Sequence, residues 1–172
     1  MFRPHRYASV AFLIGFMVCA IDVGSKIIVV ANLPGHRRVV VLGGLLTLRV
    51  LRNPGAAFGI GTSYTAIFAF VAAAVLVVIY RVARRLRSWP WAVALGLLLG
   101  GAAGNLMDRI FRAPGPLRGY VIDWIKLPYF PPTFNLADSA IVTGVALLVL
   151  ASLRGWRLDG EPPAPEPGQA VN

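Results

Sequence analysis

The sequence contains few of the residues that most enzyme active sites use. Its 172 residues include a single cysteine, Cys19, and two histidines, His5 and His36. One cysteine excludes an internal disulfide framework and any cysteine-based metal site. Zinc rarely accepts a ligand set made almost entirely of carboxylates. We therefore expect no metal and no cofactor, and we expect any catalytic chemistry to come from carboxylates.

Charged residues are also scarce, at 14% of the chain against about 25% in a typical soluble protein. Hydrophobic residues make up 57%, and the mean hydropathy of +0.69 predicts a membrane protein. The net charge of +10 comes from short groups of Lys and Arg beside apolar runs. Because these groups lack the aromatic-interleaved basic motifs of nucleic-acid-binding proteins, we expect membrane lipid as their partner and no nucleic acid.

Four apolar runs are each long enough, at about 1.5 Å per residue, to cross a hydrocarbon core of roughly 30 Å. They predict an all-α polytopic membrane protein with spans at about 8–30, 64–80, 89–107 and 135–153. The first run is too long for a cleaved signal peptide and lacks a small-residue cleavage site. The third run contains a glycine every four residues, at Gly96, Gly100 and Gly104, which indicates close contact with another helix.

Between the first two spans the hydrophobic period changes. The segment 38–42 is followed by Gly43-Gly44, and residues 46–50 then alternate apolar and polar. This pattern predicts a β-hairpin with a Gly-Gly turn, lying at a membrane surface with one apolar face. A proline-rich tail, 156–172, is expected to be disordered, which leaves residues 1–155 as the membrane domain.

An even number of spans places both termini on one side of the membrane. The short link between the second and third spans contains four arginines, Arg81, Arg84, Arg85 and Arg87. The two loops on the other side, 31–63 and 108–134, are much longer and less densely charged. The positive-inside rule therefore predicts cytoplasmic termini, with both long loops in the periplasm.

The few acidic residues gather on the side opposite the termini. Four of the seven lie outside the tail, at Asp22, Asp108, Asp123 and Asp138. Three amides map to the same level, at Asn53, Asn105 and Asn135. Polar side chains within membrane segments are costly and mark a functional site by default.

Three of these acids also have a structural explanation. Asp22 lies four residues before Lys26, so the two can pair on one helix face. Asp108 can pair in the same way with Arg112. The pattern Asn135-x-x-Asp138 matches a capping box, in which Asp138 satisfies backbone N–H groups at a helix start.

Asp123 is harder to explain structurally. It lies between Ile122 and Trp124, with no basic residue nearer than Lys126. Apolar surroundings should raise its pKa. Two neighbouring carboxylates in different environments can share one proton, as in aspartic proteases, so Asp123 and Asp138 are candidates for a catalytic pair.

Five segments, taken in order, resemble the bacterial lipoprotein signal peptidases (signal peptidase II). They are Asp22-Val-Gly-Ser-Lys26, Asn53-Pro-Gly-Ala-Ala-Phe58, Gly100-Gly-Ala-Ala-Gly-Asn-Leu-Met-Asp-Arg109, Gly119-Tyr-Val-Ile-Asp-Trp124 and Phe134-Asn-Leu-Ala-Asp-Ser-Ala140. The resemblance covers roughly residues 10–155. It implies a monomeric inner-membrane aspartic peptidase that cleaves prolipoproteins just before a diacylglyceryl-modified cysteine, and it makes the hairpin the family's periplasmic β-cradle.

The same resemblance assigns roles to particular residues. The catalytic pair falls on Asp123 and Asp138. The substrate site would be lined by Asn53, Gly55, Asn105, Arg109 and Asn135. The supporting residues would be Asp22, Lys26 and Asp108.

Two other functions fit the apolar, acid-poor composition. A small cation-coupled transporter or channel could use the same carboxylates and amides to bind an ion. A non-catalytic assembly factor could use the glycine face of the third span. The transporter is less consistent with the sequence, because the second and fourth spans are apolar at mid-depth and the polar residues stay at one end.

Overall fold

The computed structural model describes residues 5–160, except residues 34, 36 and 56–64. These residues form four long helices: α1 (His5–Asn32), α2 (Thr65–Ala83), α3 (Trp89–Phe111) and α4 (Leu136–Leu153). Each helix is long and apolar enough to cross a membrane. The described part of the chain thus contains the four apolar helices that the sequence predicts.

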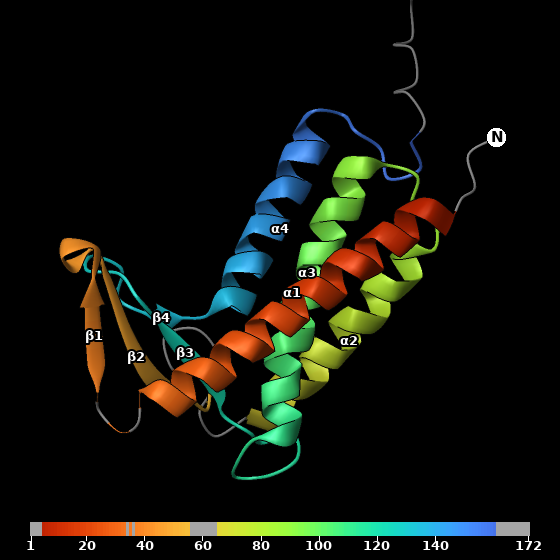
Figure 1. Ribbon diagram of the computed structural model, residues 1–172. Coiled ribbons are helices and arrows are strands. Elements are labelled where there is room, and N and C mark those ends of the chain that lie inside the picture. Colours follow the sequence, from red (N-terminus) through yellow and green to blue (C-terminus); the bar gives the residue numbers. More distant parts are fainter. Residues whose placement is uncertain (1–4, 34, 36, 56–64, 161–172) are drawn as a thin grey trace, which may run out of the picture.

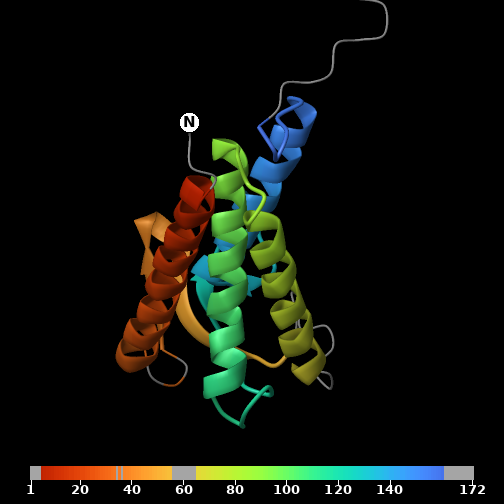
Figure 2. The same cartoon turned by 90° about the vertical axis from the view of Figure 1, so that its right-hand side faces the viewer.

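The central helix of the bundle is α3, which packs against all three others. Figure 2 shows α3 between α1 and α2, with α4 behind it. The outward side chains of the bundle are largely apolar, and large exposed residues include Phe70 and Val78 on α2 and Val142 and Val149 on α4. An apolar outer surface is what the hydrocarbon core of a bilayer requires.

Glycines on α3 bring neighbouring helices into close contact. A Cβ atom on Gly100 would lie 2.5 Å from Val18 Cβ and 2.6 Å from the Gly15 carbonyl oxygen, both on α1. Gly96 and Gly104 also face α1, so the predicted glycine face is confirmed as a helix contact. Gly101 makes a comparable contact with α4, where its Cβ would lie 2.5 Å from the Ala137 carbonyl oxygen.

The predicted hairpin is present at one end of the bundle (Figure 1). Strands β1 (Arg38–Val41) and β2 (Leu46–Asn53) pair antiparallel, and a short 3-10 turn, Leu42–Gly44, joins them. Gly43 and Gly44 have φ angles of +63° and +100°. These positive values favour glycine, which explains why this turn contains two of them.

The sheet is larger than the hairpin that the sequence predicts. Strands β3 (Val121–Lys126) and β4 (Thr133–Phe134) extend it in the antiparallel order β1-β2-β3-β4. Asp123 therefore lies on a strand, opposite Leu51 of β2, and not in an irregular loop. The first three residues of β3 are all buried. A strand covered on both faces has no apolar-polar alternation, which is why its pattern did not indicate a strand.

The segment that follows α4 folds back against the start of α3. The Leu158 carbonyl oxygen accepts a hydrogen bond from Arg87 N at 2.9 Å, and the Trp156 carbonyl accepts one from Trp91 Nε1 at 2.7 Å. The sequence assigned residues 156–160 to a disordered tail, whereas these contacts attach them to the bundle. The rest of that predicted tail, 161–172, lies outside the described residues.

The contact between α1 and α3 leads to a first prediction. In Gly104→Ala, the added Cβ would lie 2.5 Å from Asp22 Oδ2, so α1 must shift. We expect a loss of about 1–3 kcal/mol in the free energy of unfolding, as for other overpacked interiors. Thermal unfolding of the purified protein in detergent would measure it.

A matched control is Gly24→Ala on α1, because a Cβ at Gly24 meets no atom within 4 Å. It should be neutral or stabilise the helix by about 0.5–1 kcal/mol. An equal loss of stability in both variants would show that contact with α3 is not what requires glycine at position 104.

Candidate active site

The polar site begins at the first turn of α4, which carries the predicted capping box. Asn135 Oδ1 accepts a hydrogen bond from the Asp138 backbone N–H at 2.9 Å, and Asp138 Oδ2 accepts one from the Asn135 backbone N–H at 3.2 Å. These reciprocal bonds satisfy free N–H groups at the helix start and fix both side chains. Asp138 is half-buried.

Asp123 approaches this helix start from the sheet. Its side chain is 2% exposed, and both carboxylate oxygens accept hydrogen bonds from amides. Asn53 Nδ2 donates to Oδ2 at 2.9 Å, and Asn135 Nδ2 donates to Oδ1 at 2.7 Å. Asn135 therefore binds Asp138 through its backbone N–H and its Oδ1, and Asp123 through its Nδ2.

Burial raises the pKa of Asp123 from its ordinary 3.8 to about 6. The negative charge of Asp138 acts in the same direction, while the hydrogen bonds from Asn53 and Asn135 and the charge of Lys26 oppose it. The expected rise in the pKa of Asp123 is thus confirmed, and removal from water is its main cause.

Asn105 connects Asp138 to the interior of the helix bundle. Its Nδ2 donates to Asp138 Oδ1 at 2.8 Å, and its Oδ1 accepts from Lys26 Nζ at 3.0 Å and from Asn135 Nδ2 at 3.2 Å. An ammonium group can only donate, so Lys26 determines which end of this amide faces it. The donor end of Asn105 consequently faces Asp138.

The ammonium group of Lys26 lies between two carboxylates. Its Nζ is 2.7 Å from Asp22 Oδ2 and 2.9 Å from Asp108 Oδ2, and the Lys26 and Asp22 side chains are both 0% exposed. The predicted pair with Asp22 is confirmed. The pair with Asp108 joins α1 to α3, which no pattern within a single helix could indicate.

The two carboxylates that pair with Lys26 also hold the elements on either side of the site. Asp22 Oδ1 accepts from the Ala137 backbone N–H at 2.9 Å, and this bond attaches the start of α4 to α1. Asp108 Oδ2 accepts from the Ile122 backbone N–H at 3.1 Å, and Oδ1 accepts from Arg112 Nε. The strand position next to Asp123 is therefore held by α3.

Arg109 forms the edge of the site nearest to β2. Its side chain is 6% exposed, with Nη2 donating to the Gly55 carbonyl oxygen at 2.8 Å and the guanidinium carbon 5.4 Å from the centre of the Phe68 ring. Its buried Nη1 has no hydrogen-bond partner among the described residues. Asn53 Oδ1 accepts from Gly55 N at 3.0 Å and holds the same turn. The motif residues that follow, 56–58, lie outside the described residues.

All ten residues singled out in the sequence thus meet in one group, which we call the carboxylate–amide cluster. Its members are Asp22, Lys26, Asn53, Gly55, Asn105, Asp108, Arg109, Asp123, Asn135 and Asp138. Among the described residues, no three acidic, histidine or cysteine side chains lie close enough together to hold a metal ion. The cluster offers two carboxylates in different environments, Asp123 and Asp138, with amides that fix their orientation. Such a pair can transfer protons to and from a substrate.

Comparison with known proteins identifies the family. The family model for signal peptidase (SPase) II matches residues 14–154. The lipoprotein signal peptidase of Streptomyces coelicolor is 52% identical over 158 residues, which cover 92% of this chain and 77% of the relative. The chain belongs to the signal peptidase II family. The lipoprotein signal peptidase of Rhodococcus jostii is 46% identical over 156 residues, or 91% of this chain and 78% of the relative.

Two solved structures of bacterial membrane enzymes resemble this chain along most of its length. A bacterial membrane enzyme solved at 2.3 Å resolution is 27% identical and superposes with a TM-score of 0.77, covering 91% of this chain and 95% of the other. A second, solved at 1.9 Å resolution, is 29% identical, with a TM-score of 0.73 over 85% of this chain and 94% of the other. A signal peptidase II with four apolar helices is a multi-pass membrane enzyme that hydrolyses peptide bonds. Membership of a peptidase family favours this function over the transporter and the assembly factor considered from the sequence.

Two contacts of this signal peptidase II could not be anticipated from its motifs. Phe68 covers the Arg109 guanidinium from α2, and the Ala137 backbone N–H binds Asp22. Phe68 is one apolar residue in an apolar run, and a backbone N–H has no sequence signal. The Asp108–Arg112 pair, by contrast, was visible from its spacing of four residues.

The buried ion pairs lead to a second prediction. Asp22→Ala leaves the Ala137 N–H without its acceptor and Lys26 with one carboxylate fewer. We expect a loss of about 3–5 kcal/mol in stability, as when one partner of a buried pair is removed. The yield and the melting temperature should fall clearly, whereas turnover per folded molecule should change little. Turnover and melting temperature would be measured on purified protein in detergent.

The control is Asp159→Ala, which breaks an ion pair with Arg157 whose side chains are 41% and 49% exposed. An exposed pair contributes about 1 kcal/mol or less. A variant at Asp22 with normal thermal stability and lost turnover would contradict a supporting role and place Asp22 in the chemistry.

Proposed function

We propose that Asp123 and Asp138 are the catalytic pair with which this signal peptidase II removes signal peptides from prolipoproteins. The scissile bond precedes the diacylglyceryl-modified cysteine. The main support for this assignment is that Asn135 hydrogen-bonds to both carboxyl groups. It thereby fixes the position of β3 relative to the start of α4. The two acids differ in burial, as a pair with one shared proton requires.

In this proposal Asp138 is the general base. It is half-buried, and it lies in the first turn of α4. The Asn105 amide and the Asn135 backbone N–H bind its two oxygens without neutralising it. Ionised Asp138 takes a proton from the attacking water as the water oxygen bonds to the scissile carbonyl carbon.

Asp123 is the proton donor. With a pKa of about 6 it carries a proton far more readily than an ordinary aspartate. A protonated carboxyl group can still accept hydrogen bonds from Asn53 and Asn135 while its O–H points to the substrate carbonyl. The proton taken up by the pair then passes to the leaving amine as the peptide bond breaks, so the pair returns to its starting state.

The remaining polar residues bind substrate or position the pair. We assign substrate contact to Arg109, because its buried Nη1 has no partner in the described part of the chain and can donate to a peptide carbonyl. Asn53 and Gly55 hold the turn beside it, and Asn105 and Asn135 lie next to Asp138. Lys26 is a positioning residue, since it acts on Asp138 through the orientation of Asn105 and through Asp22, which holds the start of α4.

We also propose an orientation in the inner membrane. Figure 1 shows the basic link between α2 and α3 at the end of the bundle opposite the sheet. With that link in the cytoplasm, both termini are cytoplasmic and the sheet and the catalytic pair lie near the periplasmic face. Residues 1–155 then form the peptidase domain, acting as a monomer on diacylglyceryl-modified prolipoproteins.

Substitution of either acid gives the third prediction. Asp123→Asn and Asp138→Asn should each reduce cleavage of a diacylated prolipoprotein in detergent by about 10²–10⁴-fold, the range for loss of general acid–base catalysis. Cleavage is followed by the mobility shift of the substrate, and circular dichroism verifies that each variant is folded.

Asp159→Asn is the control, because Asp159 pairs with Arg157 in the segment after α4. Its activity should equal that of the unchanged enzyme. Full turnover in either of the other two variants rules out the pair. Loss of activity after treatment with EDTA, restored by adding a divalent metal, would replace the two-carboxylate mechanism with a metal mechanism.

The pKa of Asp123 gives a fourth prediction, for the pH profile. The proposed active form has Asp123 protonated, so kcat/KM should decline above about pH 6, by up to tenfold per pH unit. Asn53→Leu removes a hydrogen bond that lowers the pKa of Asp123, so the decline should move to higher pH.

The same pKa predicts the dependence of stability on pH. Folded Asp123 keeps its proton up to about pH 6, whereas in the unfolded chain it loses it near the ordinary value of 3.8. Stability should therefore fall as pH rises through that window and become level above it. A kcat/KM profile without an alkaline decline, or one unmoved in Asn53→Leu, would contradict Asp123 as the proton donor.

A further inference from the structure

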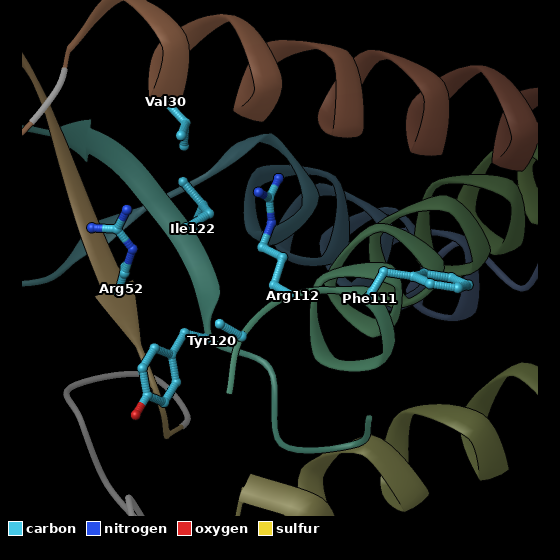
Figure 3. Close-up of a pocket in the computed structure, with 7 residues that line it drawn as sticks. Val30, Arg52, Phe111, Arg112, Tyr120 and Ile122 are labelled. Atoms are coloured by element: carbon cyan, nitrogen blue, oxygen red, sulfur yellow. The ribbon is translucent and has the colours of Figure 1, made fainter. Parts of the chain in front are cut away.

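A separate cavity of about 370 Å³ lies beside the sheet and is lined chiefly by Val30, Arg52, Phe111, Arg112, Tyr120 and Ile122 (Figure 3). Arg52 of β2 pairs with Ile122 of β3 in the sheet register. Successive side chains of a strand point to opposite faces, so Ile122 and Asp123 lie on opposite faces of β3. The cavity is therefore on the face of the sheet that turns away from the proposed catalytic pair.

The charge at this cavity is positive. It is lined by two arginines and by no acidic residue. No carboxylate of the described residues lies within ion-pair distance of Arg52. Arg112 uses only its Nε, with Asp108 Oδ1, which leaves its two terminal nitrogens free of partners in the described part of the chain. Guanidinium groups placed in this way favour a phosphate or carboxylate ligand.

The other walls are apolar or aromatic. Val30 is near the end of α1 and Phe111 is the last residue of α3, so the cavity lies where two membrane spans end. The Phe111 side chain is 73% exposed, whereas Ile122 is 2% exposed at the base of the cavity. Basic groups at the end of a span, beside apolar surface, match the depth at which lipid phosphates meet their acyl chains.

We propose that this cavity binds the phosphodiester headgroup of an anionic glycerophospholipid. Arg52 and Arg112 contact the phosphate, Tyr120 borders the headgroup, and an acyl chain follows Val30 and Phe111. Because Arg112 also binds Asp108, which holds the Ile122 N–H, the bound lipid stabilises the strand that carries Asp123. The lining residues of the cavity do not include Asp123 or Asp138, so lipid binding can be measured separately from cleavage.

The test, our fifth prediction, uses the full chain, delipidated in a neutral detergent. Dioctanoyl phosphatidylglycerol should raise the melting temperature in a saturable way, and native mass spectrometry should detect one bound molecule. Arg52→Gln should weaken this binding by about tenfold or more, the loss expected for one charge-assisted contact. Phe111→Ser should weaken it less, by removing acyl contact only.

Arg118→Gln is the matched control, because Arg118 is an exposed arginine of the same connection that does not line the cavity. It removes the same charge and should leave the affinity unchanged. Dioctanoylglycerol, which lacks the phosphate, should fail to stabilise the protein. Cleavage by Arg52→Gln in excess detergent should remain normal, so a failure here is distinct from a failure of the peptidase assignment.

Three results would overturn the proposal. Equal affinity in Arg52→Gln and the unchanged protein would exclude the guanidinium contact. Equal stabilisation by dioctanoylglycerol would exclude recognition of a phosphate. If inorganic phosphate stabilised the protein as much as the lipid does at equal concentration, the site would bind anions in general and would not recognise the lipid.

Discussion

The ammonium group of Lys26, 0% exposed, determines how the polar part of this bundle is assembled. It lies within 3.0 Å of oxygen atoms from Asp22, Asp108 and Asn105, which come from α1 and α3. An unpaired ammonium at this depth would be costly, so the two helices must come together in this register. Asp22 then binds the start of α4, and Asp108 binds β3. The position of each proposed catalytic acid therefore depends on one buried cation.

The same contacts make the two acids unequal. Asp138 has a structural role as part of the α4 capping box, and it is half-buried. Among the described residues no cation forms an ion pair with Asp123, and two neutral amides only partly replace the water it loses. The capping role of Asp138 is thus compatible with the catalytic role proposed for it. Asp123 is buried, and its pKa is raised to about 6, which suits the proton-donor role proposed for it.

The sequence predicted features that depend on neighbours along the chain. Long apolar runs indicated the four helices, and spacings of three or four residues indicated the capping box and the Asp22–Lys26 pair. Features formed across the fold gave no such signal. The first three residues of strand β3 are buried, so the strand lacks the apolar-polar alternation that would have indicated it. The contact of Lys26 with Asp108, and the cavity between Arg52 and Arg112, depend on which helices and strands become neighbours.

Packing and electrostatics meet at Gly104. Lipid tails are as apolar as the helix side chains, so helices in a membrane associate through close packing and polar contacts. Along α3, Gly96 and Gly100 provide the close packing against α1. At the next glycine of the repeat, Gly104, the space that a Cβ atom would need is occupied by Asp22 Oδ2, which pairs with Lys26. The glycine repeat thus serves two purposes: Gly96 and Gly100 allow close helix contact, and Gly104 leaves room for a carboxylate of the carboxylate–amide cluster. A change of volume there would move a carboxylate and not only a methyl group, so the effect would reach Lys26, Asn105 and, through them, Asp138.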